Sequence, residues 1–399
     1  MNILLMDPCA WLMAGHHFQF DLALATEFDR LGHSTGLLCH RDAAPSVLSA
    51  EGVFGHFTAF PGKSLSDDPL VGDLETYLQQ NADFLRDLRA LGNPADFDDT
   101  LLVFPNMFHH MLFGLAEWLE AAGQERIPDL AIVLPGLSGF DDAAGSVSWQ
   151  YALYRHGFNA LRRVAKDAPR LFALTADQAA EYTTLAGRSV RLAPYPTAAS
   201  AWPDLEPPRP RPSTGRRRVA FLGGSGGRKG FGMLPEIVAG VTQARPGTEF
   251  VIQFQQDGVN PLPADTVAEL RRMNEKVVIL DGYLDPGSFY RAILESDILL
   301  LPYGSPMYRS GSSALFEEAL YLGRPVVVPP ATTLAAGLAE LADAGRVADS
   351  RDGKAFAAAI IAVIDDYPRY SSGAVAGALR RRGSSGMNRF ARSILSEAD

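Results

Sequence analysis

The sequence predicts an α/β protein made of two doubly wound parallel sheets joined by a proline-rich linker. Three observations support this fold class. Short apolar runs of strand length alternate with segments of helical periodicity along most of the chain. The alternation stops at residues 202–217, where five prolines lie between Pro203 and Pro212, and then restarts. The length of 399 residues is sufficient for two such domains.

The first forty residues have the pattern of one strand–helix–strand unit. Residues 2–7 (NILLMD) contain a continuous apolar run, as expected for a strand that is covered on both faces. Residues 18–33 have apolar side chains at helical spacing, and Gly32 stands where this helix would end. Residues 34–40 supply the second strand. This order implies a right-handed crossover and therefore a parallel sheet.

The same alternation predicts the remaining elements of both halves. Before the linker, we expect strands at 101–104, 130–135 and 171–175 and helices near 108–122 and 148–166. After it, we expect strands at 218–224, 249–254, 277–282, 297–303 and 325–329 and helices near 231–243, 263–273, 286–295 and 315–322. Mixed helices and a polar tail are expected from residue 355 onward.

Composition and charge exclude several classes of protein. The net charge of −10 argues against a nucleic-acid-binding surface. The longest apolar tract, residues 355–364, is too short to span a bilayer. The N-terminus has no basic segment typical of a signal peptide, so a cytoplasmic protein is expected. The two cysteines, Cys9 and Cys39, are expected to be small buried thiols without a disulfide or metal role.

A glycine-rich stretch follows the first predicted strand of the second half, at residues 223–230 (GGSGGRKG). Ligands of open parallel sheets bind beyond the carboxyl ends of the strands. Glycines let the backbone approach an anion closely, and two cations stand beside them. The stretch matches neither the Walker A pattern nor the dinucleotide fingerprint. We favour phosphate binding by Gly224, Ser225, Arg228 and Lys229 over a flexible turn with a solvated basic pair.

The predicted helix 315–322 carries two adjacent glutamates that face different ways. Glu318 lies at the edge of the apolar face, whereas Glu317 points nearly opposite and is expected to be a solvated surface charge. A carboxylate beside the core needs hydrogen-bond donors. Sugar hydroxyls would serve for Glu318, and so would an arginine such as Arg309 or Arg324.

A second candidate phosphate site precedes this helix, because free N–H groups and the helix dipole favour anions there. Its residues are Ser310, Gly311, Ser312 and Ser313. One of these serines is expected to be the N-cap whatever the function. Two phosphate sites with one inward carboxylate indicate a nucleoside diphosphate. Tyr283, just after the strand 277–282, offers an aromatic face to a base or simply packs.

The first half of the chain offers candidate residues at two loops. Gly15 and His16 lie where the first helix begins, and a helix N-terminus lowers the pKa of a histidine. The neutral ring of His16 would hydrogen-bond to a substrate hydroxyl, although a structural capping role is equally compatible. Asn106 and His109 follow the strand 101–104 and are expected to face the same cleft. Adjacent histidines at 109–110 diverge on a helix, so we predict no metal site.

Residues 155–166 form a basic amphipathic helix. Its cations and apolar side chains suit a peripheral contact with the inner membrane face, as for enzymes with lipid-linked acceptors. A plain surface helix explains the same pattern and is the simpler interpretation.

Three segments resemble retaining glycosyltransferases of the GT-B fold, and most closely glycosyltransferase family four. Residues 221–238 resemble the family's strand, glycine turn and Lys-Gly before a helix. Residues 277–303 resemble its strand, short helix and a strand ending at proline. Residues 310–328 match its helix ending Glu-Ala-x-x-x-Gly-x-Pro-Val, the most specific of the three. The similarity covers nearly the whole chain and is stronger in the second half.

This resemblance implies two Rossmann-like lobes with a cleft between them. Residues 1–201 would be the acceptor-side lobe, 202–217 the linker, 218–375 the nucleotide-sugar-binding lobe, and 376–399 a C-terminal helix or tail packing on the first lobe. The implied activity transfers a sugar from a UDP- or GDP-sugar to a glycan, a lipid-linked molecule or a small molecule. It implies retention of configuration and no metal or other cofactor.

The resemblance also implies roles for individual residues. Glu318 matches the glutamate that binds the donor ribose, Lys229 the lysine that contacts the diphosphate, and Gly15 the glycine turn near the donor phosphates. The chain departs from the family at Ser310, where a glutamate is usual, and at Gly224, where an arginine is usual. These departures leave two alternatives open: a nucleotide-sugar epimerase of the same fold and a non-catalytic binding or scaffold protein.

Overall fold

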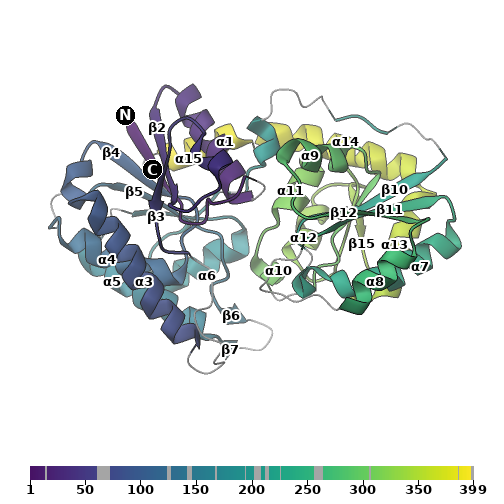
Figure 1. The fold of residues 1–399 in the computed structure, drawn as a ribbon, viewed down its shortest axis with the longest axis horizontal. Coiled ribbons are helices and arrows are strands. Elements are labelled where there is room, and N and C mark those ends of the chain that lie inside the picture. The colour runs from purple at the N-terminus through teal and green to yellow at the C-terminus, as the bar shows by residue number, and fades with distance from the viewer. Residues whose placement is uncertain are drawn as a thin grey trace. The chain divides into compact units, whose positions relative to one another are not determined.

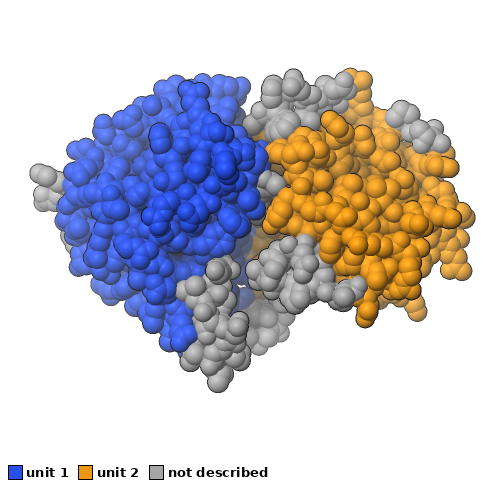
Figure 2. Space-filling view, viewed as in Figure 1, with its two compact units in different colours: residues 1–195, 387–399 blue, residues 196–386 orange. Residues whose placement is uncertain are grey.

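The computed structural model separates into two compact units, coloured blue and orange in Figure 2. Unit 1 comprises residues 1–195 and 387–399, and unit 2 comprises residues 196–386. The division therefore comes before residue 201, and the proline-rich stretch lies within the range of unit 2. The structure describes residues 1–13, 16–60, 72–123, 127–141, 146–166, 169–193, 195–201, 208–211, 215–224, 226–255, 264–304, 307–384 and 386–396.

Unit 1 is built on a parallel sheet of seven strands in the order β3-β2-β1-β4-β5-β8-β9 (Figure 1). Their bounds are β1 Asn2–Met6, β2 Ser34–His40, β3 Val53–Phe57, β4 Thr100–Phe104, β5 Asp129–Leu134, β8 Pro169–Ala173 and β9 Arg191–Leu192. A separate antiparallel pair is formed by β6 (Phe140–Asp141) and β7 (Ser146–Val147). The strand order reverses at β1, which pairs with β2 on one side and β4 on the other.

Helices cover the unit 1 sheet, with α3, α4 and α5 packed side by side (Figure 1). The helices are α1 His16–Arg30, α2 Pro45–Leu48, α3 Gly72–Leu91, α4 His109–Glu120, α5 Trp149–Val164, α6 Ala176–Ala186 and α15 Met387–Leu395, with the 3-10 turn η1 Pro94–Phe97. The last of them, α15, packs on α1, where the rings of Phe390 and Phe20 lie 5.5 Å apart. Only residues after 386 thus leave unit 2, later than the expected boundary at 376.

Unit 2 repeats this architecture with six parallel strands in the order β12-β11-β10-β13-β14-β15. The strands are β10 Arg217–Phe221, β11 Thr248–Phe254, β12 Val277–Asp281, β13 Ile298–Leu300, β14 Val326–Val328 and β15 Gly345–Val347. The helices are α7 Leu234–Ala244, α8 Ala264–Arg272, α9 Pro286–Leu294, α10 Met307–Ser310, α11 Ala314–Tyr321, α12 Thr333–Ala339, α13 Gly353–Asp365 and α14 Tyr367–Ser384. The 3-10 turns are η2 Ala198–Ala201, η3 Gly227–Lys229 and η4 Phe231–Met233. The order reverses at β10, between β11 and β13.

The predicted strands and helices correspond to observed elements in both units. The best agreement is at β2, whose bounds are the predicted 34–40. β3 was not predicted from the sequence, because Gly55 and His56 interrupt its apolar pattern. α3 was not predicted either, although buried Tyr77, Phe84 and Leu88 have helical spacing there and could have revealed it. The fold class is confirmed: two doubly wound α/β units.

The basic helix predicted at 155–166 is the second half of α5. Its apolar side chains Phe158 and Leu161 are buried in the unit 1 core, whereas Arg155, Arg162 and Arg163 are exposed. The apolar face therefore packs inside the protein, as in a surface helix, and only the cations are available to an outside partner. Within the described parts of the chain, no helix combines the length and apolar character needed to cross a membrane.

Candidate functional site

In unit 2, two loops run together beyond the carboxyl ends of β10 and β13, where the strand order reverses. This is the position at which doubly wound sheets bind ligands. The Gly304 N–H donates to the Arg228 carbonyl at 3.1 Å, which joins the loop after β13 to the loop after β10. Gly230 has φ +74°, and a Cβ there would overlap the Pro302 carbonyl oxygen. Glycine is therefore required for the two loops to approach this closely.

Hydrogen bonds also connect the glycine-rich loop, through β11, to the loop that follows β12. Gly223, with φ +88°, donates its N–H to Gln253 Oε1 at 2.8 Å. Gln253 Nε2 in turn donates to the Gly282 carbonyl at 2.9 Å, in the loop after β12. The buried Gln253 thus ties together the loops that follow β10 and β12. The sequence analysis missed this residue, although a single polar side chain near the end of an apolar strand was the available signal.

The two predicted cations lie on this loop, in η3. Lys229 folds back so that its Nζ lies 5.7 Å from the centre of the Tyr303 ring, near Gly223. The Arg228 side chain is exposed. Burial of Tyr308 raises the pKa of its hydroxyl to about 12, and the positive charge of Arg228 opposes this shift. The rings of Tyr303 and Tyr308 stack at 4.3 Å. The structure therefore brings both cations to the loop after β13 and to α10. Gly224 is on the same loop, and Ser225 lies outside the described residues.

The predicted serine-rich stretch connects α10 to α11. Gly311 donates its N–H to the Met307 carbonyl at 2.9 Å, and a Cβ on Gly311 would overlap that oxygen. Ser313 is the N-cap of α11 and accepts from the Phe316 N–H at 3.3 Å. Ser310 is buried and Ser312 is half-buried. The first N–H groups of α11 have no acceptor inside the helix and point toward the side where an anion is favoured.

The structure buries Glu318, of which 5% is exposed, and gives it protein donors. One oxygen accepts from the Ala198 N–H at 2.9 Å and from the Tyr290 hydroxyl at 3.2 Å. The Ala199 N–H lies 3.3–3.4 Å from the two oxygens. Burial raises the pKa of Glu318 to about 8. The expected alternative, an ion pair with Arg309 or Arg324, is not the arrangement found, because main-chain donors of η2 occupy that place.

The expectation for Glu317 is wrong: it is not a solvated surface charge. Its side chain is 15% exposed and pairs with Arg381 of α14. Burial raises the pKa of Glu317, and the Arg381 guanidinium opposes that shift. The helical wheel correctly placed Glu317 away from the sheet. It could not show that α14 covers this side of α11.

Tyr283 follows β12 and is 49% exposed. Its neighbour Gly282 is the residue whose carbonyl binds Gln253. Tyr283 therefore stands at the same carboxyl edge as the glycine-rich loop, with its ring open to a stacking partner. Nothing in the described part of unit 2 places it against Glu318.

In unit 1, Asn106 and His109 both contact other side chains of the protein, and their expected place at an acceptor-side cleft stays a prediction. Asn106 is 7% exposed and donates its amide to Asp7 Oδ2 at 2.7 Å. His109 packs between aromatic rings, 6.3 Å from Tyr77 and 5.3 Å from Tyr154. Burial lowers the pKa of His109 to about 4, so the ring is neutral. His109 is half-buried at the start of α4, which packs against α3 and α5, whereas Asn106 lies in the loop before α4 and turns to Asp7.

A buried carboxyl pair that was not predicted from the sequence lies beyond the carboxyl end of β1, formed by Asp7 after β1 and Asp21 of α1. Asp7 and Asp21 are both fully buried, and Asp7 also accepts from the Cys9 N–H at 2.7 Å. Burial and the charge of Asp7 raise the pKa of Asp21 well above its usual range. His17 Nδ1 lies 4.0 Å from Asp7 Oδ2. Gly15 and the His16 side chain lie outside the described residues, so the candidate role of His16 stays a prediction. Cys9 and Cys39 are buried free thiols.

Comparison with other proteins identifies the fold. No protein-family model matches the chain, and no curated protein matches it in sequence. Solved structures do match over almost the whole chain. Sucrose-phosphate synthase from Thermosynechococcus elongatus has TM-score 0.66 at 16% identity, covering 99% of this chain and 97% of that one. Anabaena HepE in complex with UDP has TM-score 0.68 at 15% identity, covering 99% and 98%.

A third match extends this likeness to another sugar-transferring enzyme. The trehalose 6-phosphate synthase from Burkholderia multivorans has TM-score 0.68 at 13% identity, covering 99% of this chain and 97% of that one. At these identities the likeness establishes the fold. The chain has the GT-B fold of glycosyltransferases.

Proposed function

We propose that this protein is a glycosyltransferase that moves a sugar from a UDP-sugar to an acceptor hydroxyl. The observation that carries the proposal is the meeting of the loops after β10 and β13 at the switch point of unit 2, with Lys229 and Arg228 beside them. Support comes from structures of the same fold, among them HepE in complex with UDP and with UDP-glucose. The resemblance of residues 310–328 to family four supports retention of anomeric configuration.

The unit 2 residues would act on the leaving group. In the transfer, the bond from the anomeric carbon to the diphosphate oxygen breaks, and a bond to the acceptor oxygen forms. The acceptor proton is released, and the diphosphate leaves with increased negative charge. Lys229, Arg228 and the N-terminus of α11 would stabilise that charge, because fixed donors in a partly desolvated site are effective at this task. No metal ion is needed in this scheme, because the cations come from the chain itself.

Tyr283 and Glu318 are the candidates for the nucleoside. The exposed ring of Tyr283 would stack on the base. Glu318 would bind the ribose hydroxyls, and the donors it already has would orient its carboxylate. In unit 1, His16 would contact the sugar or acceptor.

The test is a calorimetric and enzymatic panel on the full chain. UDP, GDP, ADP, dTDP and CMP are titrated first, and each binding nucleotide is then supplied as its sugar with a set of glycan, lipid-linked and small acceptors. We expect UDP to bind and UDP to be released only when a suitable acceptor is present. Conversion of the donor sugar to an isomer without acceptor would instead identify an epimerase. Failure of all nucleotides to bind would support a non-catalytic protein.

A further inference from the structure

A second cavity lies at the opposite edge of the unit 2 sheet, around the amino ends of β10, β11 and β12. Its volume is about 360 Å³. Five cations line it: Arg211, Arg216, Arg217, Arg218 and Lys276. Three carboxylates, Glu249, Glu275 and Asp297, share the lining. A net positive cavity in a chain of net charge −10 points to an anionic ligand.

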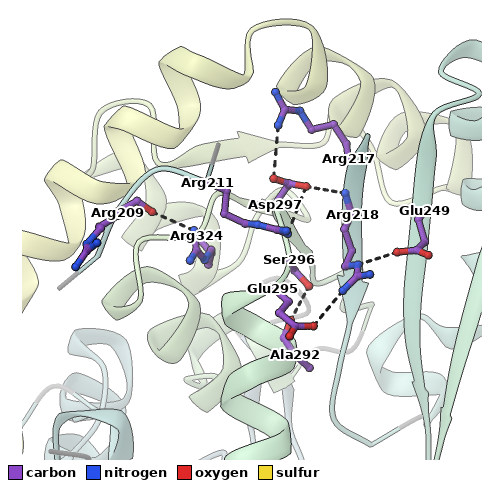
Figure 3. A network of polar contacts seen from close by, with 10 residues as sticks. All are labelled: Arg209, Arg211, Arg217, Arg218, Glu249, Ala292, Glu295, Ser296, Asp297 and Arg324. Carbon is purple, nitrogen blue, oxygen red and sulfur yellow. Dashed lines mark hydrogen bonds and ion pairs between the residues drawn. The ribbon is translucent and has the colours of Figure 1, made fainter. Parts of the chain in front are cut away.

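The arginines of this cavity are held in place by a buried carboxylate, as Figure 3 shows. Asp297 has 4% of its side chain exposed and accepts from the Arg218 N–H at 2.7 Å. Its oxygens lie 3.7 Å from Arg211 Nη1 and 3.6 Å from Arg217 Nη1. Arg217 also stacks on the Tyr367 ring at 3.7 Å. Asp297 thus orients the guanidiniums of Arg211 and Arg217 at the cavity wall.

Arg218 pairs with two carboxylates. Its Nε donates to Glu249 at 2.7 Å and its Nη1 to Glu295 at 3.1 Å. The pairing fixes β10 to β11 and to the end of α9 (Figure 3). The side of the cavity next to Lys276 is also ordered, since Lys276 Nζ donates to the Pro246 carbonyl at 2.8 Å. Arg217, Arg218 and Lys276 are therefore pre-organised before any ligand arrives, which reduces the entropic cost of binding.

We propose that this cavity binds a phosphate group, carried either by a small phosphorylated metabolite or by a lipid headgroup. Guanidinium forks match phosphate oxygens, and a phosphate monoester carries close to two negative charges. The volume exceeds that of one phosphate and falls in the range of small-molecule sites, about 300–1,000 Å³. The seven residues of β11 separate this edge from the nucleotide loops by roughly 20 Å at ~3.3 Å per residue. It is therefore a site separate from the nucleotide site.

The proposal can be tested on the full chain by titration with inorganic phosphate and glucose 6-phosphate, each compared with chloride at equal ionic strength. We expect saturable binding that weakens at least tenfold in Arg216→Gln and in Lys276→Gln. Arg271→Gln is the control, because Arg271 is an exposed arginine of α8 that pairs with Asp281 and does not line the cavity. It should bind phosphate like the unmodified chain. Arg211 is avoided because its loss also disturbs Asp297.

Two further measurements assign the source of the phosphate and separate this site from the nucleotide site. Co-sedimentation of the protein with phosphatidylcholine vesicles that contain phosphatidic acid measures binding to a lipid headgroup. A headgroup ligand is identified if vesicle binding falls in Arg216→Gln and in Lys276→Gln. Binding of glucose 6-phosphate without vesicle binding identifies a soluble ligand. UDP affinity should be unchanged in both variants. Equal effects of phosphate and chloride, or equal phosphate binding by all variants, would overturn the proposal.

Discussion

The Glu318 carboxylate of α11 accepts a hydrogen bond of 2.9 Å from the main-chain N–H of Ala198, 120 residues earlier in the chain. Ala198 begins η2, close to the start of unit 2. Glu318, for which the sequence predicts ribose binding, therefore also fixes η2, the first segment of unit 2. Changes at Glu318 should consequently affect both stability and ligand binding.

Glu318→Ala should lower the free energy of unfolding by about 2–4 kcal/mol, because it leaves buried main-chain and Tyr290 donors without an acceptor. It should also weaken UDP binding far more than Glu317→Ala does. Urea denaturation and calorimetry measure the two effects. Equal losses of UDP affinity in the two variants would remove Glu318 from the nucleotide site.

The pH dependence of stability gives a second test of Glu318. Its folded pKa of about 8 lies above its ordinary value of 4.5, so the folded state keeps a proton that the unfolded state has lost. Its contribution to stability is full below pH 4.5 and is lost as pH rises through 8. Glu318→Gln should reduce this decline by a few kcal/mol. The urea midpoints of the unmodified chain and of Glu318→Gln are measured from pH 5 to 9. Midpoints that change with pH in parallel in the two proteins would contradict this prediction.

Gly230→Ala should destabilise unit 2 by at least about 2 kcal/mol and abolish UDP binding, because a Cβ would overlap the Pro302 carbonyl at a positive φ. Gly232→Ala is the matched control, since a Cβ there would have open space and no positive φ is involved. Thermal denaturation measures the stability of both variants, and titration with UDP measures their nucleotide affinity. Equal behaviour would show that the two loops can separate without consequence.

Lys229→Gln should weaken UDP binding by about ten- to a hundredfold, the effect of losing one charged hydrogen-bond donor. It should leave stability nearly unchanged, because the side chain is only half-buried over Tyr303. Arg369→Gln controls for the loss of one positive charge elsewhere in unit 2, because exposed Arg369 of α14 pairs with Asp343, before the amino end of β15. An equal loss in both variants would mean that only the overall charge matters.

Asn106→Ala should destabilise unit 1 by about 1–3 kcal/mol, because the buried Asp7 carboxylate loses its amide donor. Asn106→Asp should cost more, since it places a third carboxyl beside Asp7 and Asp21. Asn159→Ala is the control, because among the described residues half-buried Asn159 accepts only from the exposed Arg162. Urea titrations of the three variants test the order, and an Asn106→Asp protein as stable as Asn106→Ala would contradict it.

Most of the fold follows from the sequence because strand and helix differ in period. Buried strands such as β4 and β5 are continuous apolar runs, and helices such as α1 end at a glycine with positive φ. The candidate nucleotide loops were found for a related reason: glycines and cations directly follow a buried strand. Gln253 and Tyr290 were missed because a single polar residue in an apolar element does not reveal what it contacts.

The fold class, the order of most elements and the position of the glycine-rich and serine-rich loops could all be predicted from the amino-acid sequence. These are local properties, set by periodicity and by the few residues that can adopt a turn. Only the tertiary structure decided that Glu317 is buried under α14, that Asn106 turns inward to Asp7, and that Glu318 holds Ala198. Each of these is a contact between residues at least 64 positions apart, and no local pattern specifies which distant element covers a side chain.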